Sequence, residues 1–188
     1  MFRLAHISDV HLGPLPDVRM HELMSKRITG YANWKLNRHK SHGGNAIDLI
    51  VDDIHAAQVN HVAVTGDLVN LALEAEIRSA GEWLRELGSP DTISVVPGNH
   101  DAYVRGSLSR SCHAWAGYIP QPPAPAVPGR TVEDWFPYMR KTGPVALIGC
   151  SSAVASAPFL SIGLFANAQA ERLKPLLETA GKQGLFRV

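Results

Sequence analysis

The sequence predicts an α/β protein built around a parallel β-sheet. Three short, β-rich apolar runs recur in the first half of the chain, and an amphipathic helical pattern separates each run from the next. Alternation of strand and helix is typical of βαβ units, whose strands run parallel. A length of 188 residues suits a single domain, residues 1–188, with room for a sizeable core.

The predicted elements of the first half follow in order. The strands are residues 3–8, 61–65 and 92–96. Asn45 is placed to cap a first helix, whose apolar side chains recur at i, i+3, i+4 and i+7. These side chains are Ile47, Ile50, Val51 and Ile54. A second helix is predicted by Ile77, Ala80, Leu84 and Leu87.

The second half of the chain has a different pattern. Residues 102–129 show no sustained period, and the prolines between positions 120 and 128 predict a rigid, extended connection. Residues 136–141 and 145–150 flank a turn and predict a β-hairpin. A last helix, with Asn167 as its cap, precedes a strand that begins at about Leu185.

Residues 13–44 form a long insertion after the first strand, and we expect it to be a cap-like segment beside or over the site described next. A helical stripe is predicted there from Met20, Met24, Ile28 and Tyr31. Basic residues also gather in this region, without Asp or Glu between Leu23 and Ile47. They indicate either a surface for anionic ligands or a solvated helical face.

Metal-binding side chains follow each of the three predicted strands. Asp9 and His11 follow the first, Asp67 the second, and Asn99 with His100 the third. Ligands of parallel sheets gather at the carboxyl ends of the strands, so we expect these side chains to meet at one rim. Asp9 and His11, two residues apart in extended backbone, point the same way and offer one oxygen and one nitrogen ligand.

This set of ligands suits hydrolysis of a phosphate ester. Two divalent ions about 3.5–4 Å apart clamp the ester, acidify a bound water and stabilise the leaving oxygen. Asp67 is the natural bridge because its carboxylate offers one oxygen to each ion, and Asn99 adds a neutral ligand. His100 is then predicted to meet the phosphate or protonate the leaving group, with Asp101 orienting its imidazole.

Each motif also has a plainer explanation, and only their joint occurrence at strand ends is specific. Asp-x-His occurs by chance, and Gly-Asp or Gly-Asn after a strand is often a turn. Asn70 either lines the pocket or caps the helix that follows. Among the remaining histidines we expect His6, His55 and His61 to be structural, with His6 buried in its strand, and His39 and His42 to touch substrate.

These motifs resemble those of the calcineurin-like metallophosphoesterase superfamily. The insertion, with Lys26-Arg27, Gly30-Tyr31 and Asn33-Trp34, resembles that of bacterial 3′,5′-cyclic-nucleotide phosphodiesterase-like members. The resemblance implies a sandwich of two mixed β-sheets flanked by helices. It also implies one metal on Asp9, His11 and Asp67, a second on Asp67 and Asn99, and His100 near the scissile ester.

The sequence departs from the family pattern after Asp101. Family members carry a further histidine and a Gly-His-x-His motif that nothing here matches, so the C-terminal strands are expected to be missing. The family uses two divalent ions (Mn, Fe or Zn), of which this chain is expected to hold one or none. We therefore expect impaired hydrolysis, and self-association through an exposed sheet edge.

The composition of the chain limits the classes of function that it can have. A net charge of +1 gives little general attraction for nucleic acid, and 45% hydrophobic residues fit a globular protein. No apolar run reaches the roughly 20 residues that span a bilayer, and no leader is visible, so a cytoplasmic protein is expected. The expected partner is a small phosphate ester, with a cyclic nucleotide as one candidate. The alternative is a non-catalytic binding or assembly module that retains the fold.

Overall fold

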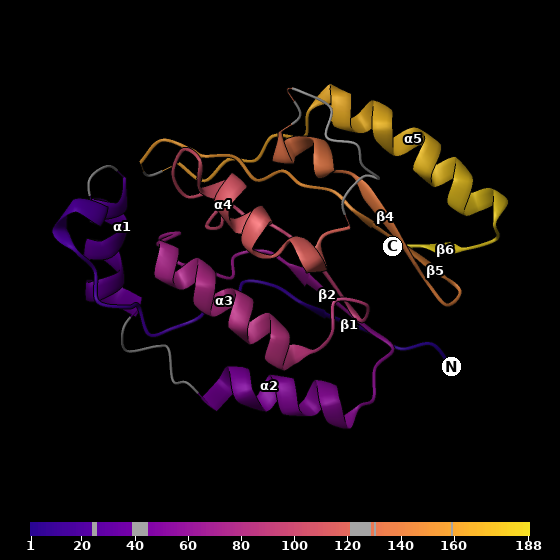
Figure 1. The fold of residues 1–188 in the computed structure, drawn as a ribbon, viewed down its shortest axis with the longest axis horizontal. Helices are drawn as coiled ribbons and strands as arrows, with labels where there is room; N and C mark the ends of the chain where they lie inside the picture. Colours follow the sequence, from indigo (N-terminus) through magenta and orange to yellow (C-terminus); the bar gives the residue numbers. More distant parts are fainter. Residues whose placement is uncertain (24–25, 39–44, 121–128, 130, 159) are drawn as a thin grey trace.

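The computed structural model describes residues 1–23, 26–38, 45–120, 129, 131–158 and 160–188. Its helices are α1 (Arg27–Asn33), α2 (Asn45–Ala56), α3 (Glu74–Leu87), α4 (Ser107–Ala114) and α5 (Asn167–Lys182) (Figure 1). Its strands are β1 (Leu4–Ile7), β2 (His61–Thr65), β3 (Ile93–Val96), β4 (Tyr138–Thr142), β5 (Val145–Gly149) and β6 (Phe186–Arg187).

The first sheet confirms the βαβ prediction. Its order is β1-β2-β3, and both pairs of neighbours are parallel. In the register, Ile7 lies opposite Val64, and Thr65 lies opposite Val96. The three strands therefore end at the same edge, and the polar segments that follow them start side by side.

The second sheet contains the predicted hairpin. Strands β4 and β5 are antiparallel, and Thr142 pairs with Val145 across the turn. Strand β6 adds to β5 in parallel, so this sheet is mixed, whereas the described strands of the first sheet are all parallel. The hydroxyl of Tyr138 on β4 donates to Val95 O on β3 at 2.9 Å and joins the two sheets.

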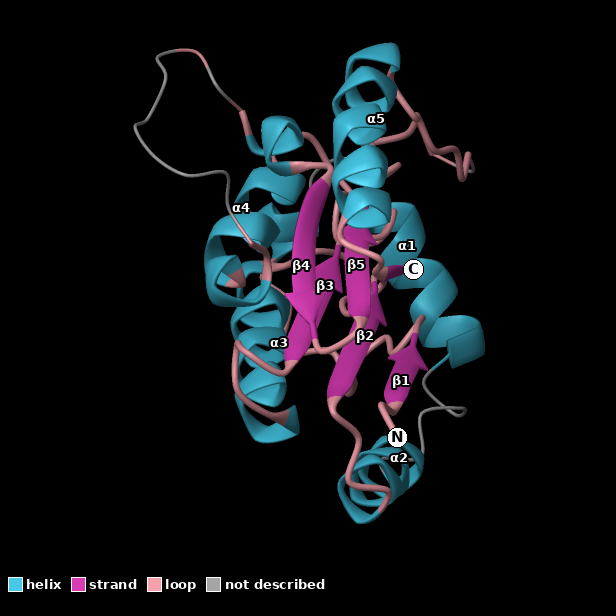
Figure 2. Ribbon diagram, turned by 90° about the vertical axis from the view of Figure 1, so that its right-hand side faces the viewer, coloured by secondary structure: helices cyan, strands magenta, loops and turns pink. Residues whose placement is uncertain are grey.

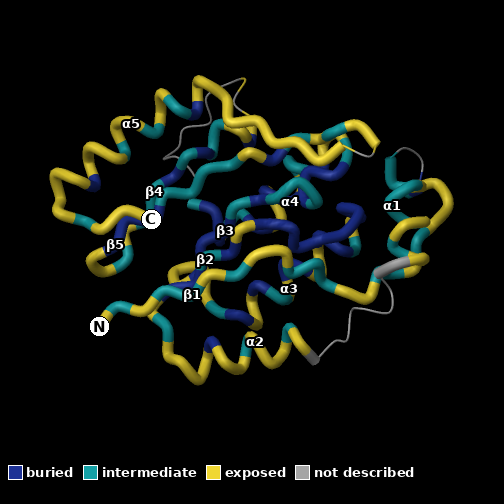
Figure 3. The backbone as a smooth tube through the Cα atoms, turned by 180° about the vertical axis from the view of Figure 1, so that it is seen from behind, coloured by how far each residue is buried: buried dark blue, intermediate teal, exposed yellow. Residues whose placement is uncertain are grey.

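The α/β architecture of two sheets flanked by helices is confirmed. Figure 2 shows α3 and α4 on one side of the strands and α5 on another. The core lies around β2, β3 and α3, whereas α2 and α5 are largely exposed (Figure 3). The predicted stripe of α3 is buried throughout, and the indole N–H of buried Trp115 donates to Ile77 O at 3.0 Å.

Helix α4 is an element that the sequence pattern does not predict. Its buried positions are Ser107, Ser111 and Cys112 rather than large apolar side chains. The Ser111 hydroxyl donates to Asp101 O at 3.0 Å, so this helix packs through hydrogen-bonded small residues. Small polar residues at helical spacing carry no hydrophobic period, which explains the wrong prediction.

Several local predictions are corrected. The insertion does not form one continuous stripe, because Met20 is 83% exposed in a separate helical turn and Ile28 is 57% exposed in α1; Met24 lies outside the described residues. Asn167 is the first residue of α5 rather than its cap, which is Ala166. His6 is exposed and bonds to Thr65 Oγ1 at 2.7 Å.

Three further predictions fall wholly or largely outside the described residues. His39, His42 and most of the proline-rich connection belong to this group. The capping side chain of Asn45 also belongs to it. Among the helices that the structure describes, none combines the length and apolar character needed to cross a membrane.

Candidate metal centre

The segments that leave β1, β2 and β3 are joined by backbone hydrogen bonds. The N–H of Asp9 donates to Gly66 O at 3.2 Å, and the N–H of His11 donates to Asp67 O at 2.8 Å. The N–H of His100 in turn donates to Asp67 Oδ1 at 2.8 Å. Residues far apart in the sequence thus meet at one rim, with Asp67 between the other two segments.

Three of the predicted ligand residues have left-handed backbone conformations, so the prediction of extended backbone from Asp9 to His11 is wrong. The φ angles are 55° at Asp9, 43° at His11 and 54° at Asp67. Such values are uncommon for residues with a Cβ and cost free energy, so they persist where the surrounding structure holds them. Their concentration at the rim indicates that the fold positions these side chains for a function.

Two glycines let the second and third segments approach closely. A Cβ on Gly66, at φ 82°, would collide with the backbone of Gly98. A Cβ on Gly98 would collide with the carboxylate of Asp67 and lie 2.6 Å from the Asp67 backbone nitrogen. The glycines of the two motifs are therefore required by the close approach, and at Gly66 also by the positive φ.

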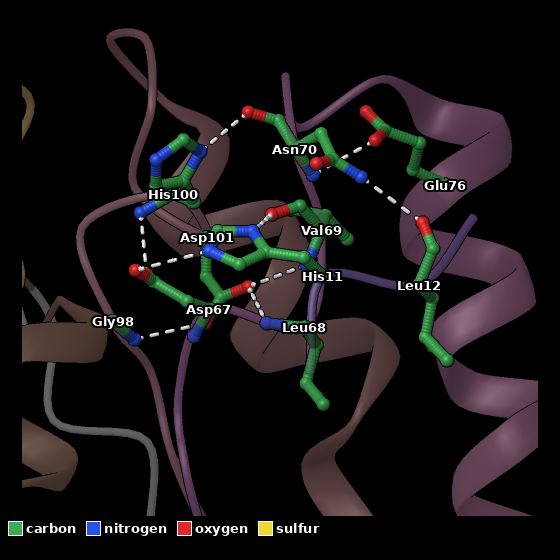
Figure 4. Close-up of polar contacts among 10 residues, drawn as sticks. All are labelled: His11, Leu12, Asp67, Leu68, Val69, Asn70, Glu76, Gly98, His100 and Asp101. Carbon is green, nitrogen blue, oxygen red and sulfur yellow. Dashed lines mark hydrogen bonds and ion pairs between the residues drawn. The ribbon is translucent and has the colours of Figure 1, made fainter. Parts of the chain in front are cut away.

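His11, Asp67 and His100 form a compact group of metal-ligand side chains. One ligand atom from each lies within 4.8 Å of the others. His11 Nε2 lies 4.0 Å from Asp67 Oδ2, and the rings of His11 and His100 meet edge to face with centroids 4.6 Å apart (Figure 4). The spacing allows one divalent ion to contact an oxygen and two nitrogens.

Asp9 and Asn99 line, together with Asp67, a cavity of about 480 Å³. Asp9 is exposed to solvent. Asp67 is thus shared between the histidine group and this cavity. The predicted metal residues meet around Asp67, but His100, which the sequence assigns to the substrate, lies among the candidate ligands.

Backbone carbonyls orient both imidazoles. His11 Nδ1 lies 3.2 Å from Val69 O, and His100 Nδ1 lies 2.6 Å from Asn70 O. A carbonyl only accepts, so each Nδ1 carries the proton, and in the neutral ring Nε2 keeps a lone pair. This is the arrangement that metal-binding histidines commonly show.

The prediction that Asp101 orients His100 is wrong. Asp101 is fully buried, and its carboxylate accepts four backbone N–H groups, those of Asp67, Leu68, Val69 and Gly98, at 2.8–3.3 Å. Burial raises its pKa to about 7, and the N–H donors oppose that rise. Asp101 therefore braces the segments that carry Asp67 and Asn99, and Asn70 O orients His100 instead.

Glu76 is a supporting residue that the sequence analysis missed. Its carboxylate accepts the N–H groups of Asn70, Leu71 and Leu73, while Asn70 Nδ2 donates to Leu12 O at 3.0 Å (Figure 4). Asn70 does not cap a helix, since α3 begins at Glu74. These contacts fix the position of Asn70, whose carbonyl oxygen orients the imidazole of His100.

The family follows from this geometry together with a comparison of known proteins. A family model described as calcineurin-like phosphoesterase matches residues 2–161, which covers all three strand-end motifs. The chain belongs to the calcineurin-like phosphoesterase family. A search of curated proteins gave no match. Members of this family are typically metal-dependent phosphoester hydrolases that act on small phosphate esters, and the family assignment supports that class of function at a coarse level.

The residues of this phosphoesterase fit a divalent ion. The mostly buried carboxylate of Asp67 and the imidazole of His11, whose Nδ1 faces Val69 O, provide mixed oxygen and nitrogen ligands, which suit Mn, Fe or Zn better than Ca. Bound divalent ions lower the pKa of a coordinated water and neutralise charge on phosphoryl oxygens. His11 and Asp67 would hold one ion, which leaves His100 to the substrate, and Asp9 and Asn99 line the cavity beside Asp67.

A second cavity, of about 450 Å³, adjoins the metal centre of the phosphoesterase. It shares Asn99 and Ser161 with the first cavity, and His100 opens into it. The insertion forms one wall of this cavity through Lys26, Thr29, Gly30, Asn33 and Trp34. The part of the insertion around α1 thus lies beside the candidate metal centre.

Proposed function

We propose that this phosphoesterase hydrolyses phosphate esters with a metal-activated water at Asp67. The observation that carries the proposal is the shared position of Asp67, which belongs both to the histidine group and to the cavity lined by Asp9 and Asn99. A carboxylate has two oxygens, so Asp67 can serve ligands on both sides. The ester's phosphoryl group would lie over this residue, between the two cavities.

The protein's own groups have separate tasks in this proposal. His11 and Asp67 bind the ion, and His100 acts on the leaving oxygen. When His100 is protonated, both ring nitrogens are donors, so Nδ1–H stays on Asn70 O while Nε2–H is available to the departing alkoxide. The carbonyl of Asn70 therefore positions the proton without taking part in its transfer.

We further propose that the 188-residue chain binds one ion more tightly than a second. The ligands His11 and Asp67 lie mostly buried, with His11 Nε2 4.0 Å from Asp67 Oδ2, whereas Asp9 is exposed and Asn99 is uncharged. A site with fewer charged protein ligands leaves more positions to water and binds less tightly. Turnover by the isolated chain is then expected to be slow, because two-metal clamping needs both sites filled.

The test combines metal binding with turnover. Calorimetric titration with Mn²⁺ is expected to show one tight site and a weak or silent second one, and hydrolysis of bis(p-nitrophenyl) phosphate is expected to be slow and Mn²⁺-dependent. Two tight sites with rapid hydrolysis would contradict the impairment. Absence of any bound metal would favour the alternative, a binding or assembly module that keeps only the fold.

A cyclic nucleotide remains one proposed substrate. The insertion-lined cavity has a volume in the range that holds drug-sized ligands, and Trp34 and Tyr103 provide aromatic surface for a nucleobase. Competition of 3′,5′-cyclic nucleotides against bis(p-nitrophenyl) phosphate hydrolysis tests this choice. Lack of competition at millimolar concentration would exclude cyclic nucleotides as substrates without contradicting the hydrolysis of other phosphate esters.

A further inference from the structure

Lys26 is held at the mouth of the insertion-lined cavity by two contacts. Its ammonium lies 4.4 Å from the centre of the Tyr103 ring and donates to Ser156 Oγ at 2.9 Å. Tyr103 stacks on His100, with ring centroids 5.4 Å apart and an interplanar angle of 25°. Lys26, Tyr103 and His100 thus form a continuous series that leads from the insertion to the metal centre.

The packing of α1 fixes the positions of Lys26 and Tyr103. A Cβ on Gly30 would overlap the Tyr103 hydroxyl and lie 2.6 Å from Leu71 Cδ2, so the helix backbone rests directly on Tyr103. The neighbouring Arg27 anchors the same helix, since its guanidinium donates to Leu71 O and Ala72 O. Arg27 therefore has a structural role, whereas Lys26 lines the cavity and is the lysine or arginine found there among the described residues.

The charge of Lys26 lacks a carboxylate partner within the described part of the chain. The ion pairs found there join other residues, and its contacts are to a hydroxyl and a π face. Partial burial lowers the pKa of Lys26. A partly desolvated ammonium facing a cavity gains most from an anion that enters it.

We propose that Lys26, seated on Tyr103, is the anion-binding residue of a substrate subsite that selects phosphate esters carrying a second phosphoryl group on their alcohol portion. The inference rests on the proposed function, because the first phosphoryl group is assigned to the metal centre. Tyr103 and His100 stand in series between Lys26 and Asp67, which separates the two anionic positions. The aromatic and amide groups of the cavity would then contact the part of the substrate that joins them.

The test compares two probes that differ in one phosphoryl group. Adenosine 3′,5′-bisphosphate and adenosine 3′-monophosphate are titrated calorimetrically into the chain, once with EDTA and once with Mn²⁺. The bisphosphate is expected to bind about tenfold more tightly than the monophosphate, as a charge-assisted contact provides. Lys26→Met, which keeps the stem over Tyr103, is expected to abolish that preference.

The matched control is Lys35→Met. Lys35 also lies over an aromatic ring, that of Tyr31 at 5.2 Å, but it does not line the cavity. The Lys35→Met variant is expected to bind the bisphosphate more tightly than the monophosphate, as the unmodified chain does. Unchanged thermal unfolding of both variants would show that Lys26→Met acts on binding and leaves folding intact.

The outcomes separate this inference from the proposed function. Equal affinity of the unmodified chain for both probes, no binding of either, or a preference that survives Lys26→Met would overturn the subsite. A preference that depends on Lys26 in EDTA, together with no Mn²⁺-dependent hydrolysis, would support the subsite and contradict the hydrolytic function.

Discussion

The carboxylate of Asp101 accepts the backbone N–H of Asp67 at 2.8 Å, so one acidic residue supports the other. The same carboxylate accepts N–H groups of Leu68, Val69 and Gly98 and thereby ties the ends of β2 and β3 together. Asp67 then presents its own carboxylate to His11 and to the backbone of His100. Asp101 thus braces the rim, and Asp67 presents the carboxylate that is proposed to bind the ion.

Asp101→Asn should reduce stability as well as activity. The amide replaces one acceptor oxygen with a donor that faces N–H groups, and the remaining bonds lose their charge. We expect the free energy of unfolding in urea to fall by about 2 kcal/mol or more. The exposed Asp91→Asn serves as control. Equal stability of the two variants would show that Asp101 does not brace the rim.

His100→Asn should separate catalysis from folding. Its imidazole is only half-buried and bonds to one carbonyl, so the free energy of unfolding should change by less than about 1.5 kcal/mol. Loss of the proton donor should lower kcat for bis(p-nitrophenyl) phosphate by about 100-fold or more. An unchanged kcat in the well-folded variant would exclude a role for His100 in the reaction.

His61 should make the stability of the protein pH-dependent. The side chain is fully buried, and burial, helped by Arg140, lowers the pKa of the imidazole from 6.5 to about 4. The unfolded chain therefore binds more protons between these values, and stability falls as the pH drops from 6.5 towards 4. This residue should account for about 2 kcal/mol of the loss between pH 8 and pH 5.

The check is urea unfolding at pH 8 and pH 5 for the unmodified chain and for His61→Gln. The amide can still bond to Ser94 Oγ, which lies 2.9 Å from His61 Nε2. The stability difference between the two pH values should shrink in this variant and persist in His113→Gln, which alters an exposed histidine. If the stability difference between pH 8 and pH 5 is equal in all three proteins, the pH dependence comes from groups other than His61.

Self-association stays a prediction, and the edge of the second sheet is its proposed place. Strand β6 lies at that edge, where Phe186 is 70% exposed and Val188 is 51% exposed. Unpaired backbone groups beside exposed apolar side chains favour pairing of edges. Sedimentation velocity should show concentration-dependent dimers that Phe186→Lys reduces. A single monomer boundary at all concentrations would count against it.

The sequence was sufficient where the physical signal is local or follows from parallel strands. Helix α3 was predictable because its buried side chains are large and apolar, and Asp9, Asp67 and Asn99 were predictable as neighbours because parallel strands end together. The role of Asp101 was not predictable from the sequence, because its partners are backbone N–H groups that include those of distant residues. Lys26 was recognisable only as one of several basic residues, because its place depends on how the insertion folds.

The most direct test of a metal centre at Asp67 is calorimetric Mn²⁺ binding by three proteins: the unmodified chain, Asp67→Asn, and the exposed Asp52→Asn on α2. Because Asp67 belongs both to the histidine group and to the cavity lined by Asp9 and Asn99, Asp67→Asn should weaken binding by about 100-fold or more, beyond the effect typical of supporting residues. Asp52→Asn should bind as the unmodified chain does. Retention of full Mn²⁺ affinity by a folded Asp67→Asn would contradict the account.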